Sequence, residues 1–143
     1  MASGYIREPS YEISFMYRKI LVPIDGSESS LRALDFALDL SKRFGSKIVV
    51  LNAKPRGLAL SDEAIEKARK RAEGRGVSIE YKVKEIDLVN ESPSSCILSE
   101  IMSGGYDAIV MGARGRSLII GPNIGSTALE VVVSSPITVI IVR

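Results

Sequence analysis

Short apolar segments alternate with amphipathic segments along most of this chain. The apolar segments are rich in Ile and Val and have the length of strands, whereas the amphipathic ones repeat their apolar residues at helical spacing. This alternation predicts an α/β fold, with an open five-stranded parallel sheet and helices on both faces, as in Rossmann-like proteins. The predicted strands are 18–25, 47–52, 77–86, 107–111 and 137–142, and the predicted helices are 27–44, 61–73, 94–103 and 126–134.

The size and composition of the chain limit what it can be. Its 143 residues can bury one core, so we expect a single domain at 16–143 after an N-terminal extension at 1–15. A net charge of +2 is too small to indicate a nucleic-acid partner. No apolar run approaches the roughly 18–20 residues of a membrane span, and no signal peptide is visible. The single Cys96 cannot form an internal disulfide, which favours the cytoplasm.

The most informative local pattern is a strand followed by a glycine-rich loop and a helix. The predicted strand at 107–111 leads into Gly112 and Gly115, and after nine more residues come Gly125, Ser126 and Thr127. Such a loop can present backbone N–H groups to an anion, and the helix N-terminus adds its dipole. We expect Gly115 and Gly125 to need positive φ angles, which β-branched residues avoid. The pattern predicts a phosphate cradle and favours a nucleotide as its ligand.

Two arginines and one aspartate are further candidates for this site. Arg114 and Arg116 lie inside the glycine loop and either face a phosphate or form solvated surface charges. Asp25 ends the first predicted strand, where it could cap the following helix and also accept a hydrogen bond from a ribose hydroxyl, and we favour the ligand role. Ligands of parallel sheets bind at the carboxyl ends of the strands, at the point where the strand order reverses. The first and fourth strands are expected to flank that point, so Asp25 and the glycine loop should converge.

The residues that are missing argue against rapid catalysis. The chain has no His, which removes the commonest general base and the partner of Ser–His and Cys–His nucleophiles. A lone Cys without His leaves no zinc constellation. The G-x4-G-K-[ST] sequence of the P-loop is absent as well, so hydrolysis of that type is not implied. The sequence therefore offers no general base for rapid hydrolysis of a bound nucleotide.

Four segments of the chain resemble the universal stress protein family. They are the opening Lys19-Ile20-Leu21-Val22-Pro23-Ile24-Asp25-Gly26-Ser27, the Val-Leu-Asn-Ala at 50–53, the Tyr-Asp-Ala-Ile-Val-Met-Gly at 106–112, and the pattern G-x2-G-x9-G-[ST] that starts at Gly112. The resemblance covers roughly residues 17–143, and the glycine spacing in a strand–helix context makes it specific. Pro122 and Asn123 depart from the usual Leu- and Gly-rich loop.

The resemblance implies a sheet of strand order 3-2-1-4-5, usually a homodimer, and in one branch of the family a bound ATP. By this resemblance Asp25 matches the aspartate at the adenine and ribose end, Pro23 lies beside it, and the backbone of Ala53 meets the adenine edge. The ribose and triphosphate cradle is matched by Met111, Gly112, Gly115, Gly125, Ser126 and Thr127.

These observations lead to one functional expectation and two alternatives. The expected function is ATP binding by a regulator or sensor in stress response, with AMP or ADP as further ligands and Mg²⁺ held through the phosphates. We expect a homodimer through residues 137–142, because this terminal strand is apolar on both faces and its open edge needs cover. The alternatives are an enzyme that uses ATP for adenylyl or phosphoryl transfer, and a ligand-free dimeric interaction module.

Overall fold

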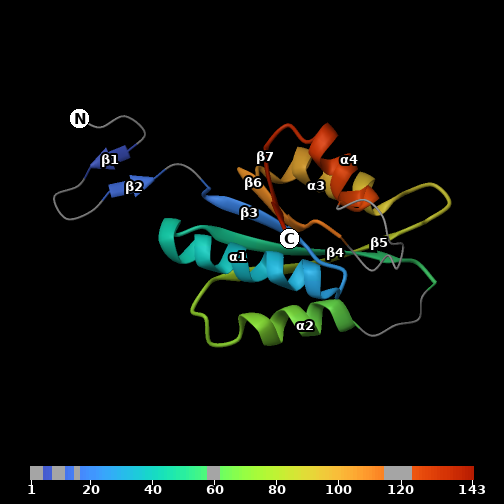
Figure 1. Cartoon of the computed structure of the whole chain (residues 1–143), viewed down its shortest axis with the longest axis horizontal. Helices are drawn as coiled ribbons and strands as arrows, with labels where there is room; N and C mark the ends of the chain where they lie inside the picture. Colours follow the sequence, from blue (N-terminus) through green and yellow to red (C-terminus); the bar gives the residue numbers. More distant parts are fainter. Residues whose placement is uncertain (1–4, 8–11, 15–16, 58–61, 115–123) are drawn as a thin grey trace.

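The sheet has the predicted strand order. The structure is a computed structural model that describes residues 5–7, 12–14, 17–57, 62–114 and 124–143. Five parallel strands form a sheet in the order β5-β4-β3-β6-β7, which is 3-2-1-4-5 when these strands are numbered along the chain (Figure 1). Their bounds are β3 Lys19–Pro23, β4 Lys47–Pro55, β5 Ile79–Ile86, β6 Ala108–Gly112 and β7 Thr138–Val142.

Two helices cover each face of this sheet (Figure 1). On one face, α1 (Glu28–Phe44) and α2 (Glu63–Ala72) pack on the side chains of β3 and β4 that include Ile20 and Val50. On the other, α3 (Pro93–Gly104) and α4 (Ser126–Ser134) pack on the alternate side chains, among them Leu21 and Ile109. The central strands are therefore buried on both sides, as their uninterrupted apolar sequences require. In the described part of the chain, no helix combines the length and the apolar character that crossing a membrane needs.

The N-terminal region contains a separate small sheet that the sequence analysis did not predict. Strand β1 (Tyr5–Arg7) pairs antiparallel with β2 (Glu12–Ser14), and Ile6 is opposite Ile13. Strands of three residues lie at the lower limit of strand length and leave almost no periodic pattern to detect.

The ends of α1 are defined by local hydrogen bonds. Ser27, not Asp25, is the N-cap, because its hydroxyl accepts the Ser30 N–H at 3.2 Å. The prediction that Asp25 could cap this helix was wrong. At the other end Gly45 has φ 70° and its N–H donates to the Ser41 carbonyl, so the helix ends at Phe44, as the predicted range of 27–44 has it.

Strand β4 is longer than predicted. The sequence indicated a loop from residue 53 because Pro55 and Gly57 follow, yet the strand runs to Pro55. The extension exists because β5 continues beside it as far as Ile86, which is opposite Pro55. Since β3 ends at Pro23, opposite Leu51, the last residues of β4 project beyond their neighbour on that side.

A buried carboxylate joins α3 to β5. Glu100 is only 2% exposed and accepts hydrogen bonds from Lys84 at 2.7 Å, Lys82 at 3.0 Å and the Tyr106 hydroxyl at 2.5 Å. Burial alone would raise the pKa of Glu100, but the hydrogen bonds from these three partners outweigh it and lower the pKa to about 2. The ionised form is therefore the one that the fold stabilises.

This cluster makes stability depend on pH in acid. In the unfolded chain the Glu100 pKa is near ~4.3, above the folded value, so its contribution is fully present above that pH and is lost as the pH falls through about 2. We expect Glu100→Gln to lose on the order of 3 kcal/mol of unfolding free energy at pH 7. Urea melts at pH 7, 4 and 2 should also show that the unfolding free energy of Glu100→Gln falls less steeply toward low pH than that of the parent. Glu80→Gln, which changes a half-exposed carboxylate on β5, is the control and should retain the parent's dependence.

Candidate functional site

A cavity of about 220 Å³ lies at the carboxyl ends of β3 and β6. The chain leaves β3 toward α1 on one face of the sheet and leaves β6 toward α4 on the other, so the two connections diverge at this edge. Divergence of this kind opens a crevice where parallel sheets bind ligands. The cavity is lined by Pro23, Ile24, Asp25, Ser30, Leu51, Ala53, Pro93, Ile97, Met111, Gly112, Ala113, Arg114, Gly125, Ser126, Thr127 and Ala128.

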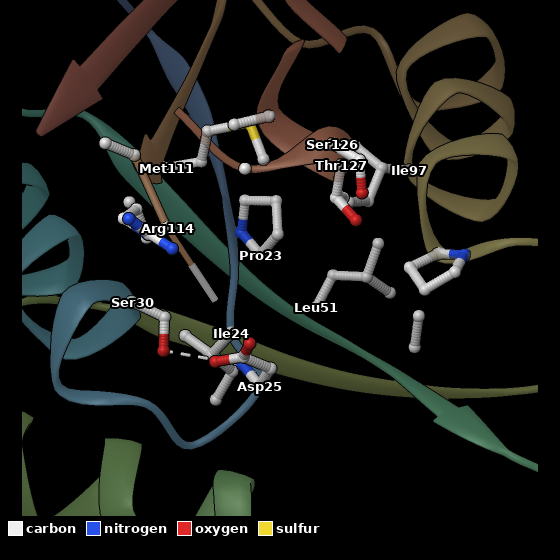
Figure 2. Close-up of a pocket in the computed structure, with 16 residues that line it drawn as sticks. Pro23, Ile24, Asp25, Ser30, Leu51, Ile97, Met111, Arg114, Ser126 and Thr127 are labelled. Carbon is white, nitrogen blue, oxygen red and sulfur yellow. Dashed lines mark hydrogen bonds between the residues drawn. The ribbon is translucent and has the colours of Figure 1, made fainter. Parts of the chain in front are cut away.

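The structure brings most of the predicted site residues together. Nine of them line this one cavity: Pro23, Asp25, Ala53, Met111, Gly112, Arg114, Gly125, Ser126 and Thr127. Gly115 and Arg116 lie outside the described residues, so their part in the site stays a prediction. Asp25 and Ser30 lie at one end of the cavity, and Ser126 and Thr127 lie at the other (Figure 2).

The side chains that sequence reasoning missed form the apolar part of the cavity. Ile24 supplies it from just after β3, Leu51 from the middle of β4 and Ile97 from α3, together with the predicted Pro23 and Met111 (Figure 2). Pro93 lines the cavity at the first turn of α3. The position of Leu51 at the end of its predicted strand was an available signal, because all carboxyl ends of a parallel sheet lie at one edge. Ile97 carried no such signal.

A tight turn after β3 presents Asp25 to the cavity. The Asp25 carboxylate accepts the Ser27 N–H at 2.9 Å, and the Asp25 N–H is 3.4 Å from the Ser30 hydroxyl, marked by the dashed line in Figure 2. Gly26 takes φ 85°, a conformation that residues with a side chain rarely adopt. The carboxylate is thus held at the start of α1 without being its cap.

The backbone of Ala53 faces the same cavity. The Ile24 N–H donates to the Leu51 carbonyl at 2.8 Å, so the backbone groups of Leu51 point toward β3. Successive residues of a strand direct their N–H and C=O groups to alternate sides, so those of Ala53 point the same way. Because β3 has ended by then, they point toward the cavity that Ala53 lines.

Two hydrogen bonds tie the glycine loop to the sheet and to α4. The Ala113 N–H donates to the Val142 carbonyl at 2.9 Å, and the Ala113 carbonyl accepts the Gly125 N–H at 2.6 Å. Gly125 is the N-cap of α4 and has no side chain to place over the first turn, whereas Ser27 and Ser92 cap α1 and α3. The α4 N-terminus therefore meets the cavity with its backbone, together with the side chains of Ser126 and Thr127.

The two described glycines of the motif serve different purposes. Gly125 has φ −76° and ψ 164°, an ordinary extended conformation, so the expectation that it needs positive φ was wrong. Gly112 is required by close packing, because a Cβ at this position would lie 2.7 Å from the Ser29 carbonyl oxygen and closer still to the Ser29 hydroxyl. Gly112 thus lets β6 approach the N-terminus of α1.

The chemistry of the cavity suits an elongated ligand with an apolar ring and an anionic end. Flat apolar surface from Pro23, Leu51 and Met111 can pack against a ring, and Asp25 and Ala53 can hydrogen-bond to its edge. Arg114 and the α4 N-terminus can receive negative charge. Among the described residues, no group of three or more His, Cys, Asp or Glu side chains could hold a metal ion.

Comparison with known proteins identifies the family. A model of the universal stress protein family matches residues 16–143. The chain belongs to the universal stress protein family.

Relatives and solved structures agree with this assignment. The chain is 30% identical to the universal stress protein YxiE of Bacillus subtilis, over 90% of this chain and all of that protein. Its fold is similar to that of a universal stress protein from Archaeoglobus fulgidus in complex with dAMP, with TM-score 0.68, 23% identity, and coverage of 90% of this chain and 100% of the other. It is also similar to a universal stress protein in complex with cAMP, with TM-score 0.70, 24% identity, and coverage of 90% and 98%.

Cys96 of this universal stress protein is part of the packing. Its side chain is buried in α3, and burial raises the pKa of the thiol. A thiol of this kind is a poor nucleophile, since the thiolate is the reactive form.

The packing of Gly112 leads to a prediction for stability. We expect Gly112→Ala to lose about 1–3 kcal/mol of unfolding free energy, because the added methyl group must displace the first turn of α1. Thermal and urea melts will measure the loss. The double variant Gly112→Ala/Ser29→Ala should recover only part of it, because the Ser29 backbone atoms remain in the way. Full stability in the single variant would contradict the close packing.

Proposed function

We propose that this universal stress protein binds adenine nucleotides, ATP among them, and acts as a nucleotide-dependent regulator or sensor in stress response. The observation that carries the proposal is the convergence of Asp25, Ala53 and the α4 N-terminus on one cavity with apolar walls. Each of these groups suits one part of a nucleotide.

The base and the ribose fit the end of the cavity near β3 and β4. Adenine presents an acceptor and a donor side by side on its edge, which complements the neighbouring N–H and C=O of Ala53. Guanine presents the opposite order on its corresponding edge, so the same backbone pair favours adenine. The Asp25 carboxylate can accept a hydrogen bond from a ribose hydroxyl.

The phosphates fit the other end. Backbone groups at the α4 N-terminus and the side chains of Ser126 and Thr127 line this part of the cavity, and Arg114, whose backbone N–H lies 3.4 Å from the Ser29 hydroxyl, lines it nearer α1. Gly115 and Arg116 are predicted to complete the cradle. Mg²⁺ would be held mainly by the phosphate oxygens, as is usual where a site lacks several acidic ligands.

The relatives support an adenine nucleotide, because universal stress proteins of similar fold have been crystallised with dAMP and with cAMP. The regulatory role rests on the chemistry of the chain. It has no His, and the cavity is lined by a single carboxylate, Asp25, among the described residues. The buried lone Cys96 suits the cytoplasm.

Calorimetric titration of the purified protein tests this proposal directly. ATP, ADP and AMP should each release or absorb heat and bind at one site per chain, whereas GTP should bind more weakly because its base edge mismatches Ala53. No binding of any adenine nucleotide at millimolar concentration would refute the proposal.

Gly125→Val provides the matched variant for the same titrations. Its φ and ψ angles are open to residues with side chains, so the backbone itself tolerates the change. The branched side chain should crowd an approaching phosphate and weaken ATP binding at least tenfold, which corresponds to about 1.4 kcal/mol. Ser126→Ala should weaken it less, because the backbone N–H groups remain.

We further propose that the chain forms a homodimer through residues 137–142. Strand β7 is an edge strand, and its side chains from Val139 to Val142 are only half-buried. Leu129, Val132 and Val133 of the neighbouring α4 are exposed apolar residues. Antiparallel pairing of two β7 edges about a two-fold axis would satisfy their open backbone groups and cover this surface.

The geometry of β7 selects the variant that tests the dimer. Because the Val142 carbonyl points toward β6, the backbone groups of Val139 and Ile141 point to the open edge. Val139→Pro should remove an edge donor and shift the sedimentation coefficient toward that of a monomer. Ile140→Pro is the control. The Ile140 N–H faces β6, so the loss of this donor should destabilise the fold of the single chain itself. A parent protein that sediments as a monomer at tens of micromolar would contradict the proposal.

A further inference from the structure

Asn52 is a buried polar residue on an apolar stripe of β4. Ile48 and Val50 precede it on the same face of the strand and belong to the core under α1 and α2. Asn52 is 8% exposed, and its amide group donates a hydrogen bond to the Ile24 carbonyl at 2.9 Å. Burying an amide is unfavourable unless it is hydrogen-bonded, so an aliphatic residue would be the simpler choice at this position. The presence of an asparagine at this position therefore needs an explanation, and its hydrogen bond provides one.

The bond lies where the β3–β4 ladder stops. The last backbone hydrogen bond of this ladder runs from the Ile24 N–H to the Leu51 carbonyl at 2.8 Å. In a ladder that continued, the next bond would run from the Ala53 N–H to the Ile24 carbonyl. Among the described residues, that carbonyl accepts from the Asn52 side chain instead. Asn52 thus holds the Ile24 carbonyl at the point where the ladder stops, and no bond from the Ala53 N–H reaches this carbonyl among the described residues.

The same bond helps to hold the backbone of Asp25, whose carboxylate is held by the Ser27 N–H. The Ile24 carbonyl and the Asp25 N–H belong to one peptide group, which is held by Asn52 on one side and lies 3.4 Å from the Ser30 hydroxyl on the other. A second contact to this turn, from the Lys67 ammonium to the Gly26 carbonyl, is also 3.4 Å long and comes from a half-exposed side chain. The bond from Asn52 is the shortest of these three contacts and the only buried one among them.

We propose that Asn52 is a positioning residue of the nucleotide site. It ends the β3–β4 ladder at Leu51, leaves the Ala53 N–H to the ligand, and holds the peptide group that carries Asp25. The inference rests on the proposed nucleotide binding, but its structural part concerns the ligand-free protein and can be tested separately.

Asn52→Leu is the variant that tests it, because Leu has a similar size and suits the apolar stripe. Without the amide, the Ile24 carbonyl becomes open to the Ala53 N–H, and the ladder can extend by one bond. We expect AMP to bind about tenfold more weakly by calorimetry, as loss of one ligand hydrogen bond would produce. In the ligand-free variant, the Ala53 amide should exchange with deuterium more slowly than in the parent.

Ser46→Ala is the matched control. Ser46 is also a buried residue whose side chain donates to a backbone carbonyl, that of Tyr17, but it lies just before β4, at the opposite end of the sheet. Its loss should lower the melting temperature while AMP affinity and Ala53 exchange stay at parent values. General destabilisation by Asn52→Leu would speed up exchange at Ala53, so the direction of the change separates positioning from a merely structural role.

The outcomes are distinct. Slower Ala53 exchange with weaker AMP binding supports the proposal. Parent-like AMP affinity in Asn52→Leu, or faster exchange at Ala53, overturns it. If the parent binds no adenine nucleotide, the proposed function fails, and slower Ala53 exchange would still establish that Asn52 ends the ladder.

Discussion

The arrangement of the site depends on the early end of β3 in the middle of a parallel sheet. Pro23 closes the strand opposite Leu51, whereas β4 continues to Pro55 beside β5. This difference in length leaves the backbone of β4 without a strand partner on one side, and the turn at Asp25 and Gly26 can then bend toward α1. The cavity exists because the chain leaves β3 and β6 toward opposite faces of the sheet at the same edge.

Sequence patterns predicted the elements that have strong hydrophobic periodicity or clear start and stop residues. The end of α1 at residue 44 and the bounds of α4 at 126–134 are confirmed by the structure, and so is the strand order that the family resemblance implied. The length of β4 was wrong, because pairing with β5 overrides the local signal of Pro55. A single sequence shows its own turn residues, but it does not show how far a neighbouring strand extends.

The site was predicted in outline and missed in its details. Most of the predicted residues line one cavity, because they lie at strand ends or helix starts that the fold must bring to one edge. The geometry of individual residues was less accessible. Asp25 does not cap α1, and Gly125 has a negative φ. Asn52 belongs to the matched segment 50–53, but no role could be predicted for its side chain, since the partner of its amide is 28 positions away in the sequence. Hydrogen bonds between distant residues leave no periodic trace.

The two hydrogen bonds of Ala113 have a practical consequence for work with this protein. They connect Val142, at the end of β7, through one residue to the N-cap of α4 and so to the mouth of the cavity. A change to the chain immediately after Val142 is therefore expected to affect both the cavity and the open edge of the sheet. An affinity tag or a reporter fused at that end would lie next to both, whereas the amino-terminal end of β3 lies at the opposite edge of the sheet from the cavity.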